Sequence, residues 1–119
     1  MKDQPDEGGP VVRVWHGRVA SQRAEEYLRL MREVAVPDYR ETPGNLAAYA
    51  LSRTEDAVTH VLMLSCWESL AAVAAFAGEP MEQAKYYDFD SDFLLEFEPT
   101  VQHYTVSSGA SDRSADFCI

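Results

Sequence analysis

The side chains best suited to acid–base chemistry in this sequence are three histidines, each in a different apolar, β-branched stretch: His16, His60 and His103. Imidazole is a frequent general base because histidine ordinarily titrates near neutral pH. Three histidines and a water molecule can also hold zinc, but no His-x-His or His-x-x-x-His spacing occurs. We therefore expect no metal site. Two interpretations of His60 stay open, a core or interface histidine and a base that deprotonates a phenol, and we take His60 forward as the candidate base.

One cation and several aromatic side chains could complete a pocket around such a base. Arg13 interrupts an apolar stretch, so it lies either at the rim of a sheet or opposite an anionic ligand or enolate. Large aromatic residues usually pack in a core, but in a pocket they stack on flat aromatic ligands. Tyr86 is a second candidate donor. The candidate substrate-binding residues are Trp15, Trp67, Phe76 and Tyr49.

The acidic run DFDSDFLLEFE, residues 88–98, resembles a metal-binding loop only superficially. It lacks the glycine at the sixth position and the glutamate at the twelfth that a calcium-binding EF-hand loop requires. We interpret it as a solvated acidic loop. No dinucleotide-binding glycine motif, P-loop or nucleophile elbow is present, so nothing indicates nucleotide or serine-hydrolase chemistry.

The charge balance excludes several kinds of partner. Ten basic residues against twenty acidic ones give a net charge of -10, which repels phosphate backbones and anionic lipid heads. No apolar run approaches the ~20 residues of a membrane span, and the acidic N-terminus does not resemble a secretory signal. Two cysteines, Cys66 and Cys118, suggest neither a disulfide framework nor a zinc cluster. We expect a cytoplasmic protein with reduced thiols that binds neither nucleic acid nor membranes.

The apolar periodicity predicts which elements position these side chains. Alternating or β-branched stretches predict strands over residues 11–19, 45–53, 58–67 and 100–106. Apolar residues at helical spacing predict helices over residues 24–35 and 70–77, and a further helical turn over residues 81–87. The polar ends, residues 1–10 and 107–119, are predicted to be disordered, which leaves one domain over residues 11–106.

Capping residues set the predicted ends of the two helices. Ser21 is expected to cap the first helix, and Pro37 to end it because proline lacks an amide hydrogen. Ser69 is expected to cap the second helix and Gly78 to end it.

The order of elements is β-α-β-β-α-β, which is typical of a ferredoxin-like α+β fold with a four-stranded antiparallel sheet. Helices inserted in this way cover one face of the sheet. The third strand, VTHVLMLSCW at residues 58–67, has no polar face, so the other face also needs a cover. A second copy of the sheet is the simplest one, and we therefore expect a homodimer.

Four stretches support a resemblance to a known family: VVRVWHGRV, PGNLAAYAL, LSCWESLAAVAAFAG and FEPTVQHYTV. With them, residues 11–106 resemble the antibiotic biosynthesis monooxygenase-like family. The resemblance implies a ferredoxin-like chain that pairs as a dimeric α/β barrel. It also implies one of several activities, because the family includes cofactor-free oxygenases of polycyclic phenols, haem-degrading enzymes and members without an assigned activity.

The haem-degrading branch is similar to this chain, but this chain differs from it at the residues with which that branch binds and degrades haem. The resemblance places that branch's Asn, Trp and haem-ligating His at Gly17, Phe76 and Tyr86. None of the three is retained, although tyrosine can ligate haem iron. We expect no cofactor.

The function implied by the resemblance is that of a cofactor-independent monooxygenase acting on a small planar aromatic or quinol-type substrate. His60 is the expected base, and Arg13 or Tyr86 the expected donor to the developing oxyanion. Two alternatives stay open: a non-catalytic ligand-binding or stress-related dimer, and a cofactor-free isomerase or lyase. Oxygen consumption separates the first function from both alternatives. Aromatic side chains that fill the pocket completely would favour a structural role for them.

Overall fold

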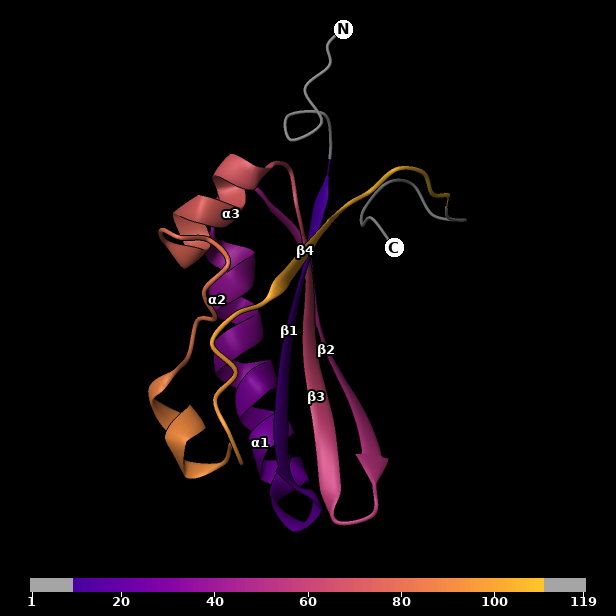
Figure 1. Ribbon diagram of the computed structural model, residues 1–119, viewed down its shortest axis with the longest axis vertical. Helices are drawn as coiled ribbons and strands as arrows, with labels where there is room; N and C mark the ends of the chain where they lie inside the picture. The colour runs from indigo at the N-terminus through magenta and orange to yellow at the C-terminus, as the bar shows by residue number, and fades with distance from the viewer. Residues whose placement is uncertain (1–9, 111–119) are drawn as a thin grey trace, which may run out of the picture.

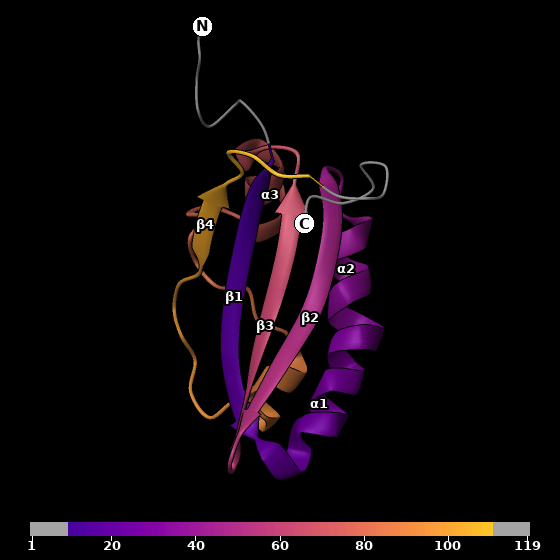
Figure 2. The same ribbon diagram turned by 90° about the vertical axis from the view of Figure 1, so that its right-hand side faces the viewer.

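The structure is a computed structural model that describes residues 10–110 and contains one four-stranded antiparallel sheet (Figures 1 and 2). The strands are β1 (Val11–Ala20), β2 (Asn45–Glu55), β3 (Val58–Trp67) and β4 (Gln102–Thr105). Their order in the sheet is β2-β3-β1-β4. In Figure 1 the sheet is seen nearly edge-on, with the helices all on one side of it. The predicted ferredoxin-like α+β fold is confirmed.

The first helical region is longer than predicted and contains a π-helical turn. It comprises the 3-10 turn η2 (Ser21–Arg23), α1 (Ala24–Leu30), the π-helical turn η3 (Met31–Ala35) and α2 (Val36–Glu41). The prediction that Pro37 ends the helix is wrong. The amide of Val36 bonds to the carbonyl of Met31, five residues back, and Pro37 lies in the first turn of α2, where a missing amide hydrogen costs little.

The second predicted helix is confirmed as α3 (Leu70–Ala77), with both of its end signals. The Ser69 side chain accepts a hydrogen bond from the amide of Ala72, and Gly78 ends the helix at a φ of +84°, a conformation that favours glycine. Ser21, in contrast, does not cap the first helix. Its hydroxyl donates to the carbonyl of Asp56 instead.

The segment after α3 differs from the prediction of a helical turn over residues 81–87. It contains no helix until η4, a 3-10 helix over Asp88–Asp92. The carbonyls of Met81 and Gln83 accept hydrogen bonds from the Arg13 guanidinium, at 2.8 and 3.1 Å. These contacts fix residues 81–83 against the sheet in a non-helical path.

The two faces of β1 alternate between buried and half-exposed residues, as expected for a strand with one covered face. Val11, Arg13, Trp15 and Val19 are buried beneath the helices. The residues between them face the opposite side, which no helix covers in residues 10–110 (Figure 2). We call this side the open face.

On the edge of β1 that faces away from β3, an irregular segment rather than a strand flanks the second half of β1. β4 pairs only with residues 11–14 of β1. Beyond that point Leu94 forms a bridge with Val19, and the amide of Leu95 donates to the carbonyl of Arg18 at 2.9 Å. The acidic run therefore follows the edge of the sheet instead of forming a free loop.

Several expectations concern the ends of the chain and its environment. The predicted disorder of residues 1–9 and 111–119 lies outside the described residues. No helix within residues 10–110 has the length and apolar composition needed to cross a membrane. Cys66 is disulfide-bonded, so the expectation of reduced thiols is wrong for this residue.

Candidate functional site

His60 lies on the open face, in rows of side chains set by the strand register. Opposite residues of antiparallel strands project to the same face. The register therefore forms one row from Leu51, Leu62 and His16, and the next row from Arg53, His60 and Arg18. A histidine thus lies between two arginines, next to a row with two leucines.

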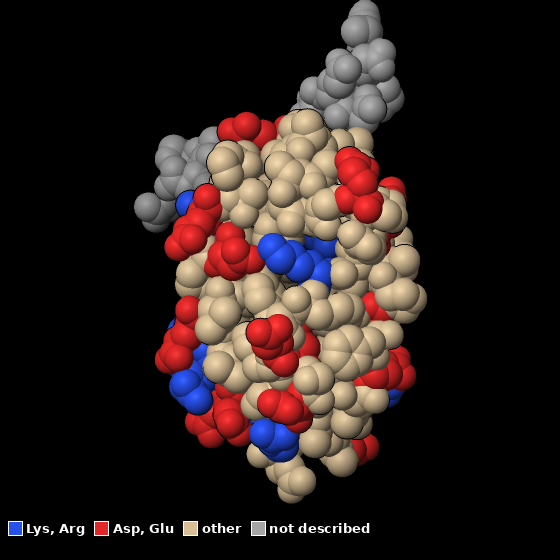
Figure 3. Space-filling view, turned by 90° about the vertical axis from the view of Figure 1, so that its left-hand side faces the viewer, with Lys and Arg blue, Asp and Glu red and all other residues tan. Residues whose placement is uncertain are grey.

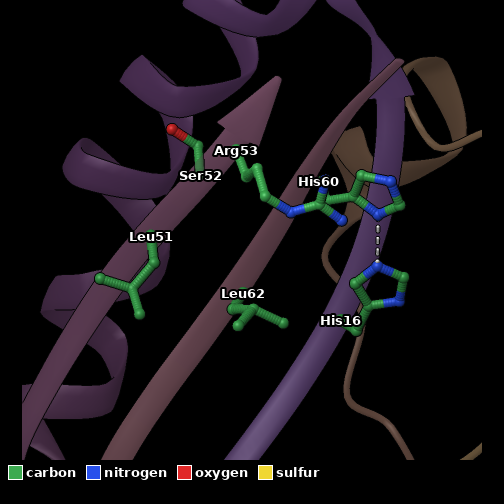
Figure 4. A pocket seen from close by; sticks show the side chains of 6 residues that line it. All are labelled: His16, Leu51, Ser52, Arg53, His60 and Leu62. Atoms are coloured by element: carbon green, nitrogen blue, oxygen red, sulfur yellow. Dashed lines mark hydrogen bonds between the residues drawn. The ribbon is translucent and has the colours of Figure 1, made fainter. Parts of the chain in front are cut away.

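A pocket of about 260 Å³ opens between these two rows (Figure 4). It is lined by His16, Leu51, Ser52, Arg53, His60 and Leu62. In Figure 4 the guanidinium of Arg53 lies beside the His60 ring, and Leu51 and Leu62 form an apolar surface next to them. Ligand pockets usually measure about 300–1,000 Å³, so this one suits a small ligand.

The two histidines of the pocket belong to a hydrogen-bonded chain of side chains. Nδ1 of His16 lies 2.5 Å from Oε2 of Glu98, and Nε2 of His16 lies 3.0 Å from Nδ1 of His60. The planes of the two rings are 19° apart and their centroids 5.3 Å apart, so the rings meet edge to edge through this hydrogen bond. At the far end, Nε2 of His60 lies 3.5 Å from Oε1 of Glu55. The chain of contacts runs from the edge of the sheet to the pocket.

The Arg13 side chain lies on the opposite side of the sheet, buried to 1% exposure. The interpretation that Arg13 lies at the rim of the sheet is wrong, because the helices and residues 81–83 cover it. Its Nη1 atom also lies 3.0 Å from Nε2 of His103. Burial and the nearby Arg13 charge lower the pKa of His103, so this imidazole is neutral and accepts the hydrogen bond.

Two buried donors on this side lack a hydrogen-bond partner within residues 10–110: Nε of Arg13 and Nε1 of Trp15. Burial also lowers the pKa of Arg13, although an arginine remains charged at neutral pH. Figure 3 shows one basic patch near the centre of the helix-covered side and others toward its lower part and edges, among acidic side chains.

The predicted aromatic walls pack on one another instead of lining the pocket. The ring centroids of Trp67 and Phe76 are 5.1 Å apart, and those of Tyr39 and Phe76 are 4.5 Å apart. Trp15 meets Tyr86 edge to face at 6.1 Å. Such mutual packing favours a structural role for these rings.

The structure therefore divides the predicted site residues between two sides of the sheet. Five lie on the helix-covered side: Arg13, Trp15, Trp67, Phe76 and Tyr86. His60 lies on the open face, and so does Tyr49, opposite Leu64 in the strand register. His60 and Arg13 cannot act on one substrate from opposite sides of the sheet. Their individual roles stay predictions.

The histidines also divide between the two sides. His16 and His60 meet on the open face, whereas His103 contacts Arg13 beneath the helices. The convergence of all three is therefore excluded. In residues 10–110, no three His, Cys, Asp or Glu side chains are arranged to hold a metal ion.

Sequence reasoning missed Glu98 and Arg53 at this site, and it also missed the pairing of His16 with His60. Arg53 could have been found, because it precedes the turn between two predicted strands and pairs with His60 in a short hairpin. Glu98 gave no such signal, since it reaches His16 from 82 positions away through an irregular segment.

The fold and the site define a class of protein: a small ferredoxin-like α+β domain with a histidine pocket on its uncovered sheet face. The family model described as antibiotic biosynthesis monooxygenase matches residues 10–84. The chain belongs to this family. A comparison with curated proteins gives no match.

Several solved structures share the fold at low sequence identity. A candidate antibiotic biosynthesis monooxygenase from Nitrosomonas europaea is 16% identical, with a TM-score of 0.66 over 93% of this chain and 100% of that one. A similar protein from Bacillus cereus is 16% identical, with a TM-score of 0.60 over 87% and 99% of the two chains. One from Bacteroides thetaiotaomicron is 22% identical, with a TM-score of 0.56 over 88% and 94%. At these identities the likeness shows the fold alone.

Proposed function

We propose that this protein is a cofactor-independent monooxygenase that oxidises a small planar aromatic or quinol-type substrate in the open-face pocket, with His60 as the base. The observation that supports this function best is the position of His60, which lines a small pocket between an arginine and an apolar surface. Family membership supports the reaction class.

The pocket residues divide the work of binding and activation. Leu51 and Leu62 contact the flat face of the substrate, and burial of that face supplies the binding free energy. His60 accepts the acidic proton of the substrate. The guanidinium of Arg53 lies beside His60 and stabilises the anion that forms.

The anion is electron-rich enough to reduce dioxygen directly. A ring carbon of the substrate forms a bond to one oxygen atom, and the resulting peroxide takes back a proton. Loss of one water molecule then leaves a carbonyl group. For a ring CH₂ oxidised in this way, one oxygen atom remains in the product and the other leaves with two hydrogens as water, so no external reductant is required.

We also propose that the protein functions as a homodimer that covers part of the open face. The end of this face remote from the arginines is apolar and carries Val12, Val14, Leu64 and Tyr104. Tyr104 is 59% exposed. A second copy would cover this apolar end, while the charged rows at the other end leave the pocket at the margin of the interface.

A second candidate function is a non-catalytic protein that binds a small ligand in the same pocket. One observation favours it: the aromatic rings expected to bind the substrate pack in the core instead. Such a protein would bind a planar aromatic ligand without consuming oxygen.

Oxygen uptake with a panel of quinols and anthrones separates the two functions. The monooxygenase consumes one dioxygen per carbonyl product formed, and a Leu51→Trp variant, which fills the pocket, loses this activity. A Leu95→Trp variant is the matched control, because Leu95 is exposed to a similar degree, 51% against 42% for Leu51, but does not line the pocket. Saturable binding of the panel without oxygen uptake would contradict the monooxygenase and support the second function.

A further inference from the structure

We infer that Glu98 and His16 form a proton relay behind His60, which keeps a lone pair on Nε2 of His60 and takes up the proton removed from the substrate. The substrate in this inference rests on the proposed function. The hydrogen-bond partners rest on geometry, and the direction of the bonds rests on a Glu98 carboxylate that can only accept.

The carboxylate at one end of the chain fixes the direction of every hydrogen bond. An ionised Glu98 can only accept, so Nδ1 of His16, at 2.5 Å, must donate. A neutral His16 then has its lone pair on Nε2 and accepts from Nδ1 of His60, at 3.0 Å. A neutral His60 that donates from Nδ1 keeps its lone pair on Nε2. We assign this nitrogen, which lies 3.5 Å from Oε1 of Glu55, to the substrate.

The surrounding charges explain why a relay is needed. An imidazolium at His60 would lie in the same row as Arg18 and Arg53, and like charges directly opposite one another are unfavourable. Glu96 pairs with Arg18 at 2.6 Å, and Glu55 pairs with Arg53 at 3.4 Å. Glu55 also reaches His60, but it is shared with Arg53, and both side chains are 64% exposed, so water screens the two charges alike. Arg18, at 33% exposure, is the less screened arginine of the row.

Transfer along the relay avoids an imidazolium at His60. The substrate proton passes to Nε2 of His60, and the proton on Nδ1 of His60 passes to Nε2 of His16. The result is a substrate anion, a neutral His60 and a His16 imidazolium whose Nδ1 donates to the Glu98 carboxylate. The positive charge thus lies beside Glu98 and away from the row of arginines, and the substrate anion remains beside Arg53. The reverse transfer returns the proton to the peroxide.

The acidic segment holds Glu98 in place for this role. Its backbone is fixed to the edge of β1 by the hydrogen bond from Leu95 to Arg18. The hydroxyl of Tyr86 donates to the carbonyl of Glu98, and the Tyr86 ring packs on Phe97 with centroids 4.6 Å apart. The Glu98 carboxylate is 33% exposed.

A matched pair of variants tests the relay: Glu98→Gln and Glu96→Gln. Both neutralise a carboxylate on the same segment, but only Glu98 contacts His16, whereas Glu96 contacts Arg18. In ¹⁵N NMR spectra of the histidine rings, we expect His60 of the wild type and of Glu96→Gln to be protonated on Nδ1 when neutral. In Glu98→Gln this tautomer gives way to a mixture. Protonation of His60 on Nε2 in the wild type, or identical tautomers in both variants, would overturn the relay.

Kinetics give the second readout with the quinol or anthrone that shows oxygen uptake. Glu98→Gln should lower kcat at least ~10-fold and change KM little, because the wrong tautomer removes the base but not the pocket. Glu96→Gln should retain kcat. If Glu98→Gln does not fold, His16→Phe breaks the same link and should lower kcat equally. Equal kcat in wild type and in a folded relay variant would overturn the relay. The expected tautomers without any turnover would leave the relay standing and refute the proposed function.

Discussion

Nε2 of His16 lies 3.0 Å from Nδ1 of His60, although 44 positions separate them in the sequence. The two residues are not opposite one another, because His16 faces Leu62 and His60 faces Arg18 in the strand register. They meet diagonally across β1 and β3. A slip of one residue in this pairing would turn one imidazole toward the helices, so the strand register itself assembles the site.

The open face predicts self-association. Light scattering after size exclusion should give about twice the chain mass for the wild type, since the apolar end of this face needs a cover. Leu64→Glu places a charge within that end and should give a folded monomer. Leu95 lies in the acidic run along the edge of the sheet and is 51% exposed, so the Leu95→Glu variant should remain a dimer. A wild type that stays monomeric and folded at every concentration would refute the homodimer.

Gly17 is predicted to tolerate no side chain. A Cβ atom at this position would lie 2.6 Å from Cη2 of Trp15 and 2.9 Å from Cδ2 of Leu94. Trp15 is buried and cannot move freely, so Gly17→Ala should lower the free energy of unfolding by about 1–3 kcal/mol in urea titrations. Gly109→Ala is the control, because nothing lies within 4 Å of its Cβ. Equal stability of both variants would contradict the close packing.

The hydroxyl of Tyr27 should contribute to stability through Asp90. It donates to Oδ1 of this buried carboxylate at 2.7 Å, and burial already raises the pKa of Asp90. Tyr27→Phe leaves the buried oxygen unpaired and should cost about 1–3 kcal/mol by chemical unfolding. Tyr104→Phe, at a residue 59% exposed, should cost almost nothing. A Tyr27→Phe variant as stable as Tyr104→Phe would show that Asp90 is satisfied by other groups.

His103 should make the stability depend on pH. Burial and the Arg13 charge lower its pKa in the folded state, so the unfolded chain binds a proton first as the pH falls. The free energy of unfolding should therefore decrease as the pH falls from about 7 to about 5, where an ordinary histidine titrates. His103→Gln should flatten this decrease. An unchanged slope, measured by urea unfolding across this range, would assign the pH dependence to other groups.

The fold could be predicted from local signals in the sequence, whereas the grouping of the site residues could not. Alternation in residues 11–19 and the Ser69 and Gly78 signals predicted their elements correctly, because each depends on neighbours in the sequence. Strand alternation puts Arg13 and Trp15 on the same face of β1, but it does not tell which face the helices cover. That choice decided that Arg13 lies in the core and His60 in the pocket.

Two remaining differences have separate causes, one in the local backbone and one in a contact between distant parts of the sequence. The first helix continues past Pro37 because a π-helical turn removes the need for its amide hydrogen. Glu98 reaches His16 only because residues 93–98 follow the free edge of β1. No periodicity in the sequence encodes such a path.

The central claim is that His60 is the base of an oxygen-dependent reaction, and turnover of His60→Ala tests it most directly. Oxygen uptake with an anthrone- or quinol-type substrate should fall ~100-fold or more, the usual scale for the loss of a general base. The melting temperature should stay near that of the wild type, because the His60 side chain is only partly buried on the open face. His103→Ala, a histidine on the opposite side of the sheet, should retain uptake in proportion to its folded fraction. A His60→Ala variant that is fully folded and fully active would contradict the account.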